Sequence, residues 1–255
     1  MVLRGQPVGE QGAADRWAAL AGDEPRARER GGARPGSPFF HAATLRSGGM
    51  YSIFLIGNIA SGKSSAARYL GSRGARVIDL DRACKDMYVP GSPLVDDLVQ
   101  EFGPSILSPD GSVDSHALAD RAFCDSVSVA VLNETVHPYI AKYVADILLP
   151  SNCCSTLVPE FPLTVVEMSV PEQYSELFPL ADEVVAITCD PHVRCERALA
   201  RGMTACDVSA RMDAQPPEEF LCSMASTVIV NDGSEQELYA KLDAWLSNRG
   251  IDLLR

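Results

Sequence analysis

The sequence predicts an α/β fold of three layers, in which helices cover both faces of a mainly parallel sheet of five strands. Five short apolar segments lack the alternation of polar and apolar residues that a half-exposed strand shows, which is typical of strands buried on both faces. Helical patterns separate these segments, and a helix that connects two strands of one sheet makes them parallel. The fold class therefore follows from these two observations.

The expected strands can be placed in order along the chain. The first is Tyr51–Ile56, and a Gly/Ser turn and a helix from Lys63 to about Ser72 follow it. The second strand is expected at Arg76–Leu80. The remaining three are expected at Leu163–Met168, Glu183–Thr188 and Thr227–Val230.

The stretch between the second and third strands breaks the alternation of strand and helix. It holds no convincing strand, and its apolar spacing predicts helices at 94–102, 115–123, 126–136 and 138–147. Pro138 is interpreted as a helix start, because proline is favoured at the first helical position. We therefore expect a helical insertion at about 82–150, within a sheet domain made of 50–81 and 156–250.

Residues 1–49 differ in composition from everything after them. They are rich in Gly, Ala, Arg, Pro and Glu and contain no isoleucine, so they cannot bury enough apolar surface to offset the entropy of ordering. Five acidic residues stand among the seven arginines of this stretch, which argues against a mitochondrial presequence. We expect a disordered tail, or translation from an upstream start with Met50 as the true one.

Charge and composition exclude several classes of function. The 255 residues carry a formal net charge of −12, which argues against a protein that binds nucleic acid through an overall basic surface. A small polyanionic ligand in a locally positive pocket stays compatible with that charge. No apolar run approaches the ~20 residues that span a bilayer, and we expect no membrane segment. The eight cysteines include no C-x-x-C pair, which favours reduced thiols and a cytoplasmic location.

One motif predicts a phosphate site. The segment Gly57-Asn58-Ile59-Ala60-Ser61-Gly62-Lys63-Ser64 matches G-x-x-x-x-G-K-[ST] directly between a strand and a helix. The backbone N–H groups of such a loop cradle phosphates, and the following helix adds the positive end of its dipole. We expect Lys63 to reach the β- and γ-phosphates of ATP and the Ser64 hydroxyl to bind Mg²⁺, with Ser65 in the same site.

Two aspartates follow the second expected strand. Asp79 and Asp81 stand on either side of Leu80, at the end of the strand that faces the ligand crevice of an open α/β sheet. Strand alternation predicts that the two carboxylates point the same way. Asp81 is the candidate that orients the acceptor hydroxyl and accepts its proton. For Asp79, capping of the following helix is an equally good interpretation.

A basic cluster stands out in this acidic chain. Arg194, Arg197 and Arg201 recur at helical spacing, which places them on one face, and Arg211 follows. Such a face suits a lid that stabilises a transferring phosphoryl group. For Arg194 we favour a solvated helix face instead. Arg201-Gly202 ends the expected helix where a lid would hinge.

The chain resembles the dephospho-coenzyme A kinase family over residues 50 to 250, because it has the motifs of that family in the same order. The family has a GKS/T loop and a D-x-D pair whose second aspartate lies eighteen residues past the lysine, as in Lys63 and Asp81. Further matches are PGSPL at 90–94, FG at 102–103, DG at 110–111, LN at 132–133, HP at 137–138, Arg197, Arg201, Arg211, Gln215 and VIVNDG at 228–233.

The resemblance implies a P-loop kinase core, a helical substrate-binding insertion and a lid at about 194–215. It implies transfer of the ATP γ-phosphoryl to the ribose 3′-hydroxyl of dephospho-coenzyme A, with Asp81 as base and with Lys63 and Arg201 on the phosphates. The implied site residues are Arg197 and Asn231 for ATP, and Asp79, Asp81, Asn133 and His137 for the acceptor. His137 is placed in the substrate domain without a catalytic role.

Departures from the family pattern leave alternatives open. Ala60 replaces a common glycine, Met168-Ser169-Val170 replaces P-L-L, and Ser115, Leu221 and Ser226 replace an arginine, a basic residue and an aspartate. A kinase of another small metabolite, or a nucleotide-binding regulator that has lost catalysis, are the alternative hypotheses. The sequence does not decide between ATP and GTP or give the oligomeric state.

Overall fold

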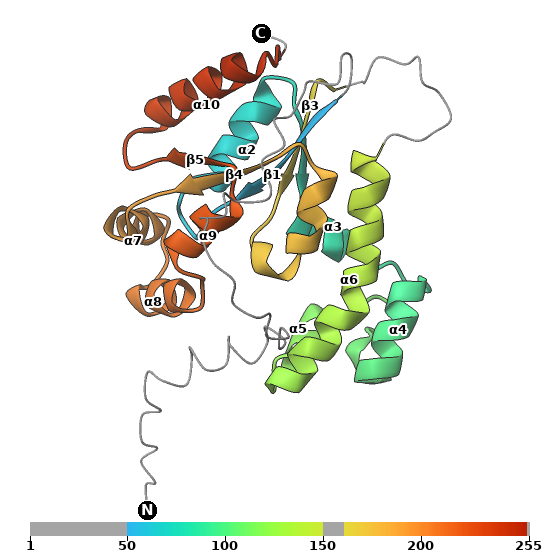
Figure 1. The fold of residues 1–255 in the computed structure, drawn as a ribbon. Helices are drawn as coiled ribbons and strands as arrows, with labels where there is room; N and C mark the ends of the chain where they lie inside the picture. Colours follow the sequence, from blue (N-terminus) through green and yellow to red (C-terminus); the bar gives the residue numbers. More distant parts are fainter. Residues whose placement is uncertain (1–49, 150–160, 254–255) are drawn as a thin grey trace, which may run out of the picture. The chain divides into compact units, whose positions relative to one another are not determined.

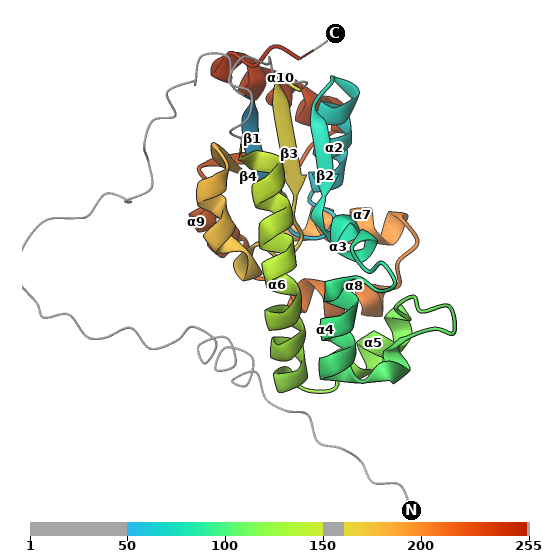
Figure 2. The same cartoon turned by 90° about the vertical axis from the view of Figure 1, so that its right-hand side faces the viewer.

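The computed structural model describes residues 50–149 and 161–253. In these residues, five strands form one sheet in the order β2-β3-β1-β4-β5, and every neighbouring pair is parallel (Figures 1 and 2). The strands are β1 (Tyr51–Ile56), β2 (Arg76–Asp79), β3 (Leu163–Glu167), β4 (Glu183–Thr188) and β5 (Thr227–Val230). The predicted parallel sheet is confirmed. The expectations for 1–49 and the domain boundary at 156 lie outside the described residues.

The place of β1 in the strand order predicts where a ligand binds. It pairs with β3 on one side and β4 on the other, so the strand order reverses around it. In open parallel sheets, the carboxyl ends of the strands at such a reversal border a crevice. The loop that follows β1 therefore starts beside the ends of β3 and β4.

Nine helices and three 3₁₀ turns connect the strands within the described residues. They are α2 (Lys63–Ser72), α3 (Leu80–Asp86), α4 (Pro93–Phe102), η1 (Pro104–Ile106), α5 (Ser115–Ala122), α6 (Ser126–Leu148), η2 (Pro171–Gln173), η3 (Ser175–Leu180), α7 (Pro191–Ala200), α8 (Ala205–Asp213), α9 (Glu218–Met224) and α10 (Glu235–Arg249). Helices α2 and α10 lie on one face of the sheet, and α6 and α9 lie on the other (Figure 1). None of the described helices has the length and apolar character needed to cross a membrane.

The strand β1 shows why the apolar segments lack alternation. Ile53 and Leu55 pack into the core beneath α2 and α10, and Phe54 and Ile56 pack into the core on the opposite face. All four side chains have no exposed surface. Burial of each large apolar side chain contributes about 1.5–3 kcal/mol, so both layers of helices are fixed to this strand.

Helix α10 is fixed to the sheet by a buried carboxylate. Glu183, at the start of β4, accepts from Arg249 Nη2 at 2.6 Å and from the Tyr51 hydroxyl at 2.9 Å. Thr227 also donates to this carboxylate. Burial, with the Glu183 carboxylate beside it, raises the pKa of Tyr51 to about 12. The group ties the end of α10 to β1, β4 and β5.

The segment between β2 and β3 is helical as predicted, but two of its expected helices are one. Helix α6 runs without a break over 23 residues, and Pro138 lies inside it rather than at its start. Proline in a helix costs about 3 kcal/mol, because it lacks an N–H and its ring crowds the preceding turn. Val136, Ile140, Val144 and Leu148 form a buried stripe along α6. Their burial outweighs the cost of the proline.

Candidate active site

The loop after β1 is built around two glycines that leave no room for a side chain. A Cβ on Gly57 would lie 2.5 Å from Ile187 O, on the neighbouring strand β4. Gly62 has φ of +100°, and a Cβ there would lie 2.2 Å from Asn231 Nδ2. Asn231 Nδ2 donates to Ser61 O at 2.7 Å. The loop is therefore held against the ends of β4 and β5.

Ala60 stands where the family commonly has a glycine, and its backbone adopts a left-handed conformation that is strained for alanine. Its φ is +58°, and among the described residues it alone is a non-glycine with positive φ. A left-handed conformation costs a residue with a Cβ roughly 1–2 kcal/mol. The Ala60 methyl group is buried against Ala198 and Val208, which offsets part of this cost.

The ammonium group of Lys63 lies at the end of β3. Its Nζ donates to Met168 O at 2.8 Å and to Ser169 Oγ at 2.9 Å, and it lies 3.9 Å from Glu167 Oε1. Burial lowers the pKa of Lys63, and the carboxylates of Glu167 and Asp81 partly oppose this shift. The lysine is thus desolvated, while its positive charge is supported by acidic groups on two sides.

Ser64 and Glu167 form a pair of oxygen ligands beside the lysine. Ser64 Oγ donates to Glu167 Oε1 at 2.6 Å. A hydroxyl and a carboxylate are hard oxygen ligands of the kind that Mg²⁺ takes, together with water and phosphate oxygens. Sequence analysis missed Glu167. The available signal was an acidic residue that ends a buried strand, but only the strand order shows that this strand lies next to β1.

The two aspartates after β2 do not share one strand face, and the alternation argument is wrong here. The strand ends at Asp79 and α3 begins at Leu80, so Asp81 lies in the first turn of a helix. Asp79 is the N-cap of α3 and accepts from Arg82 N at 3.0 Å, as its capping interpretation predicted. The Asp81 carboxylate lies near enough to Lys63 and Tyr174 to raise the pKa of each.

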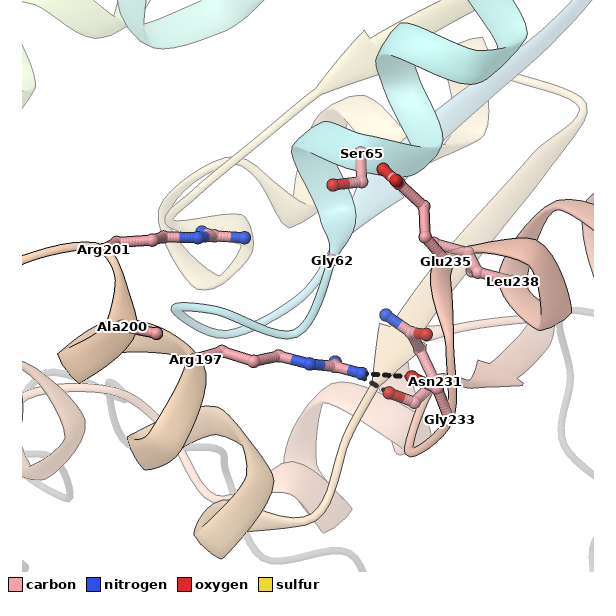
Figure 3. A pocket seen from close by; sticks show the side chains of 9 residues that line it. All are labelled: Gly62, Ser65, Arg197, Ala200, Arg201, Asn231, Gly233, Glu235 and Leu238. Carbon is pink, nitrogen blue, oxygen red and sulfur yellow. Dashed lines mark hydrogen bonds between the residues drawn. The ribbon is translucent and has the colours of Figure 1, made fainter.

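Helix α7 brings two arginines to the loop. Arg197 donates to Asn231 O at 2.8 Å and to Gly233 O at 2.6 Å, and these bonds fix the edge of its guanidinium to the segment after β5 (Figure 3). Arg201 follows the last turn of α7 and extends toward the start of α2. The two side chains therefore flank one hollow from the same side.

That hollow consists of two adjoining cavities. One has a volume of about 350 Å³ and is lined by Gly62, Ser65, Arg197, Ala200, Arg201, Asn231, Gly233, Glu235 and Leu238 (Figure 3). The other, of about 520 Å³, is lined by Gly57, Asn58, Ile59, Ala60, Gly62, Lys63, Ser64, Ser65, Arg68, Ser169, Arg201 and Gln215. The cavities share Gly62, Ser65 and Arg201. Residues predicted from the loop motif and from the arginine cluster thus line adjoining cavities.

The segment between α8 and α9 also contacts the loop. Gln215 Oε1 accepts from Ile59 N at 2.8 Å, and Pro216 O accepts from Asn58 Nδ2 at 3.1 Å. These bonds fix the first half of the loop to the segment between α8 and α9.

The prediction that Arg194 lies on a solvated helix face is wrong. Its side chain is buried with 6% of its surface exposed, and its Nε and Nη1 have no hydrogen-bond partner within the described residues. Arg194 lies one turn before the buried Ala198 on α7. Helical spacing shows which arginines lie near one another on α7. It does not show that the side of the helix that carries Arg194 faces the core.

Helix α6 carries Asn133 and His137 one turn apart. His137 Nε2 pairs with Glu176, and its ring stacks on Tyr174 with centroids 5.4 Å apart. Burial raises the pKa of Tyr174 to about 12, and the nearby Cys84 and Asp81 add to this shift. Sequence analysis missed Tyr174, which lies between two short 3₁₀ turns, and Glu176, which lies in the second, because such turns show no periodicity.

A family model described as dephospho-CoA kinase matches residues 51–237. The chain belongs to the dephospho-CoA kinase family. The dephospho-CoA kinase of Thermobifida fusca is 35% identical over 198 residues, which cover 77% of this chain and 95% of the relative. That of Streptomyces avermitilis is 33% identical over 198 residues, covering 77% and 93%. The resemblance drawn from the ordered motifs is confirmed.

Solved structures agree on the fold. A crystal structure from Thermus thermophilus has a TM-score of 0.62 and 29% identity, and the match covers 78% of this chain and 97% of that one. The dephospho-CoA kinase from Campylobacter jejuni has a TM-score of 0.52 at 19% identity, with coverage of 78% and 97%. The parallel sheet and its connections are thus those of the dephospho-CoA kinase fold.

Two departures from the dephospho-CoA kinase pattern have structural roles. Leu221 is buried in the core between α9 and β4. Ser226 Oγ donates to Val184 O at 3.0 Å and accepts from Val184 N at 3.1 Å, which joins the start of β5 to β4. Neither residue lines the two cavities. Both residues therefore serve packing and strand pairing in this chain.

Proposed function

We propose that this chain transfers the γ-phosphoryl group of ATP to the ribose 3′-hydroxyl of dephospho-coenzyme A, giving coenzyme A and ADP. The observation that carries the proposal is the convergence of Lys63, Ser64 and Glu167 with Asp81 at the carboxyl ends of β1, β2 and β3. Membership of the family supports the choice of acceptor. The cysteine pattern supports a place in the cytoplasm.

The two cavities suit the two halves of ATP. The base and ribose would occupy the smaller cavity, against the flat guanidinium of Arg197 and beside Asn231. The phosphates would occupy the larger cavity, which is lined by the loop after β1 and by the positive end of α2. Arg201 lines both cavities, so it is placed to contact the phosphates that join them.

Ser64 and Glu167 would hold the Mg²⁺ that accompanies ATP, since Ser64 lines the phosphate cavity and its hydroxyl is hydrogen-bonded to Glu167. When bound, the cation neutralises phosphate charge. Lys63 adds a fixed positive charge, and its desolvated position strengthens its attraction for phosphate oxygens.

Asp81 would orient the acceptor hydroxyl and accept its proton. Its carboxylate is exposed in the first turn of α3 and lies near enough to Lys63 to favour the charged ammonium. Proton acceptance there prepares the ribose oxygen to attack the γ-phosphorus in line with the leaving ADP oxygen. Asp79 has one oxygen committed to the cap of α3, and the other stays available to the acceptor.

The acceptor would bind between α3, α6 and the 3₁₀ turns after β3. Asn133 and His137 lie on α6, and the stacked Tyr174 provides an aromatic surface within reach of Asp81. We infer that the helices between β2 and β3 form the substrate-binding insertion, and that residues 194–215 form the lid.

The test is incubation of the full chain with ATP, Mg²⁺ and dephospho-coenzyme A, with coenzyme A and ADP measured side by side. Equal formation of both products supports the proposal. Formation of ADP without coenzyme A points to another acceptor, and ATP binding without turnover points to a regulator that has lost catalysis. Lys63→Ala is expected to weaken both phosphate binding and turnover, whereas the exposed Lys142→Ala, on the outside of α6, should change neither.

A further inference from the structure

The ammonium of Lys63 is hydrogen-bonded to the segment that follows β3. An ammonium has three N–H donors. Two of them are used by Met168 O at 2.8 Å and Ser169 Oγ at 2.9 Å, while the carboxylate of Glu167 lies at 3.9 Å, beyond hydrogen-bond distance. In the part of the chain that the structure describes, the third N–H has no acceptor.

The two acceptors differ in how firmly they are held. Met168 continues the line of β3, because its N–H donates to Leu55 O at 3.0 Å and its side chain is buried with 1% exposed. Its carbonyl is therefore a fixed point. Ser169 is the next residue, and its side chain is exposed to the phosphate cavity that Lys63 also lines. A fixed carbonyl and an adjacent hydroxyl thus bind the same nitrogen from one side.

We propose that Ser169 is a positioning residue for Lys63, in addition to the site residues assigned above. Its hydroxyl and the Met168 carbonyl together hold Nζ so that the remaining N–H faces the phosphates. This inference rests on the proposed function for its effect on turnover. A lysine has a long and flexible side chain, and a single acceptor would leave Nζ free to swing about that one bond. Two acceptors remove this motion before the nucleotide arrives.

The consequence for the reaction concerns charge that develops in the transition state. Groups that are already oriented toward that charge stabilise it without having to reorganise. Loss of the Ser169 hydroxyl should therefore lower kcat more than it raises the KM for ATP.

The test compares Ser169→Ala and Ser169→Thr with the unaltered full chain, and Ser72→Ala serves as control because Ser72 is an exposed serine that bonds only within α2. Ser169→Ala is expected to lower kcat about tenfold with the KM for ATP within about twofold. Ser169→Thr keeps the hydroxyl and should restore kcat. Circular dichroism checks that each variant is folded.

A second measurement reports on the Lys63 amine directly and does not require dephospho-coenzyme A. Acetic anhydride at pH 8 modifies neutral amines, and mass spectrometry of the Lys63 peptide, normalised to exposed Lys142, gives its rate. Ser169→Ala should raise this rate about threefold, because an Nζ held by one acceptor alone is more often exposed to the reagent, and Ser169→Thr should not. An unchanged rate in Ser169→Ala, or a change that Ser169→Thr fails to reverse, overturns the inference. If the unaltered chain makes no coenzyme A while the Lys63 rate responds as expected, the proposed acceptor fails and the role of Ser169 stands.

Discussion

Replacement of Glu167 by glutamine tests the centre of the proposed site. Glutamine has the same shape and keeps an oxygen that accepts from the Ser64 hydroxyl, so the 2.6 Å hydrogen bond can persist. The change removes one negative charge from a position 3.9 Å from Lys63 Nζ. The effect of the variant is therefore an effect of charge rather than of packing.

The magnitude follows from the geometry. Two unit charges at the separation of 3.9 Å interact with about 4 kcal/mol at an effective dielectric constant of about 20, which suits side chains as buried as these. Loss of this attraction lowers the pKa of Lys63 further, in the same direction as burial. The lysine is protonated below its pKa and loses its charge as the pH rises through it. The alkaline limb of the pH profile should therefore move to lower pH.

The assay is coenzyme A formation as a function of Mg²⁺ concentration. Loss of a carboxylate that holds or orients a metal typically costs 10–100-fold in metal affinity, so the half-saturating Mg²⁺ concentration should rise by about that factor. Binding of ATP without Mg²⁺ should be as tight or tighter, because a carboxylate no longer repels the phosphates. Glu101→Gln, on the exposed face of α4, is the matched control. An unchanged Mg²⁺ dependence in Glu167→Gln would refute the assignment.

Three further substitutions test other parts of the structure. Asp81→Asn should cut turnover by ~10²-fold or more while calorimetry shows nearly unchanged ATP binding, and full turnover would exclude Asp81 as the base. Arg197→Lys should weaken ATP binding several-fold, because an ammonium cannot bridge the Asn231 and Gly233 carbonyls as a guanidinium does; equal affinity would contradict this role. Arg249→Ala leaves the Glu183 carboxylate buried without its cation, so urea unfolding should show a loss of about 3 kcal/mol, and a loss below about 1 kcal/mol would argue against it.

The elements that sequence analysis placed well share one property. Strands such as β1 and β4 are largely apolar because both of their faces are buried, and the glycines of the loop after β1 are required by close contacts. In each case a local pattern and the tertiary environment favour the same conformation. Such agreement makes sheet and loop predictable without knowledge of the neighbours.

The misplaced residues depend on the environment instead. Asp81 lies on a helix because α3 starts directly after β2, which alternation along a strand cannot reveal. Pro138 is tolerated because a buried stripe on α6 outweighs its cost, and that stripe is recognisable only once α6 lies against the core. Glu167 gained its role from the pairing of β3 with β1, which joins residues far apart in the sequence. Each of these facts is a property of packing.

The bond network of Arg197 has a mechanical consequence. Because its guanidinium is tied to the segment after β5, α7 is anchored to the sheet, and Arg201 at its end stays in place as well. Beyond α8, Gln215 and Pro216 are hydrogen-bonded to the loop after β1. Gly202, with φ of +88°, is the first residue beyond the anchored helix. The stretch that contains α8 is therefore fixed at both ends to segments that line the two cavities, and Val208 on α8 packs against Ala60 in the loop between those ends.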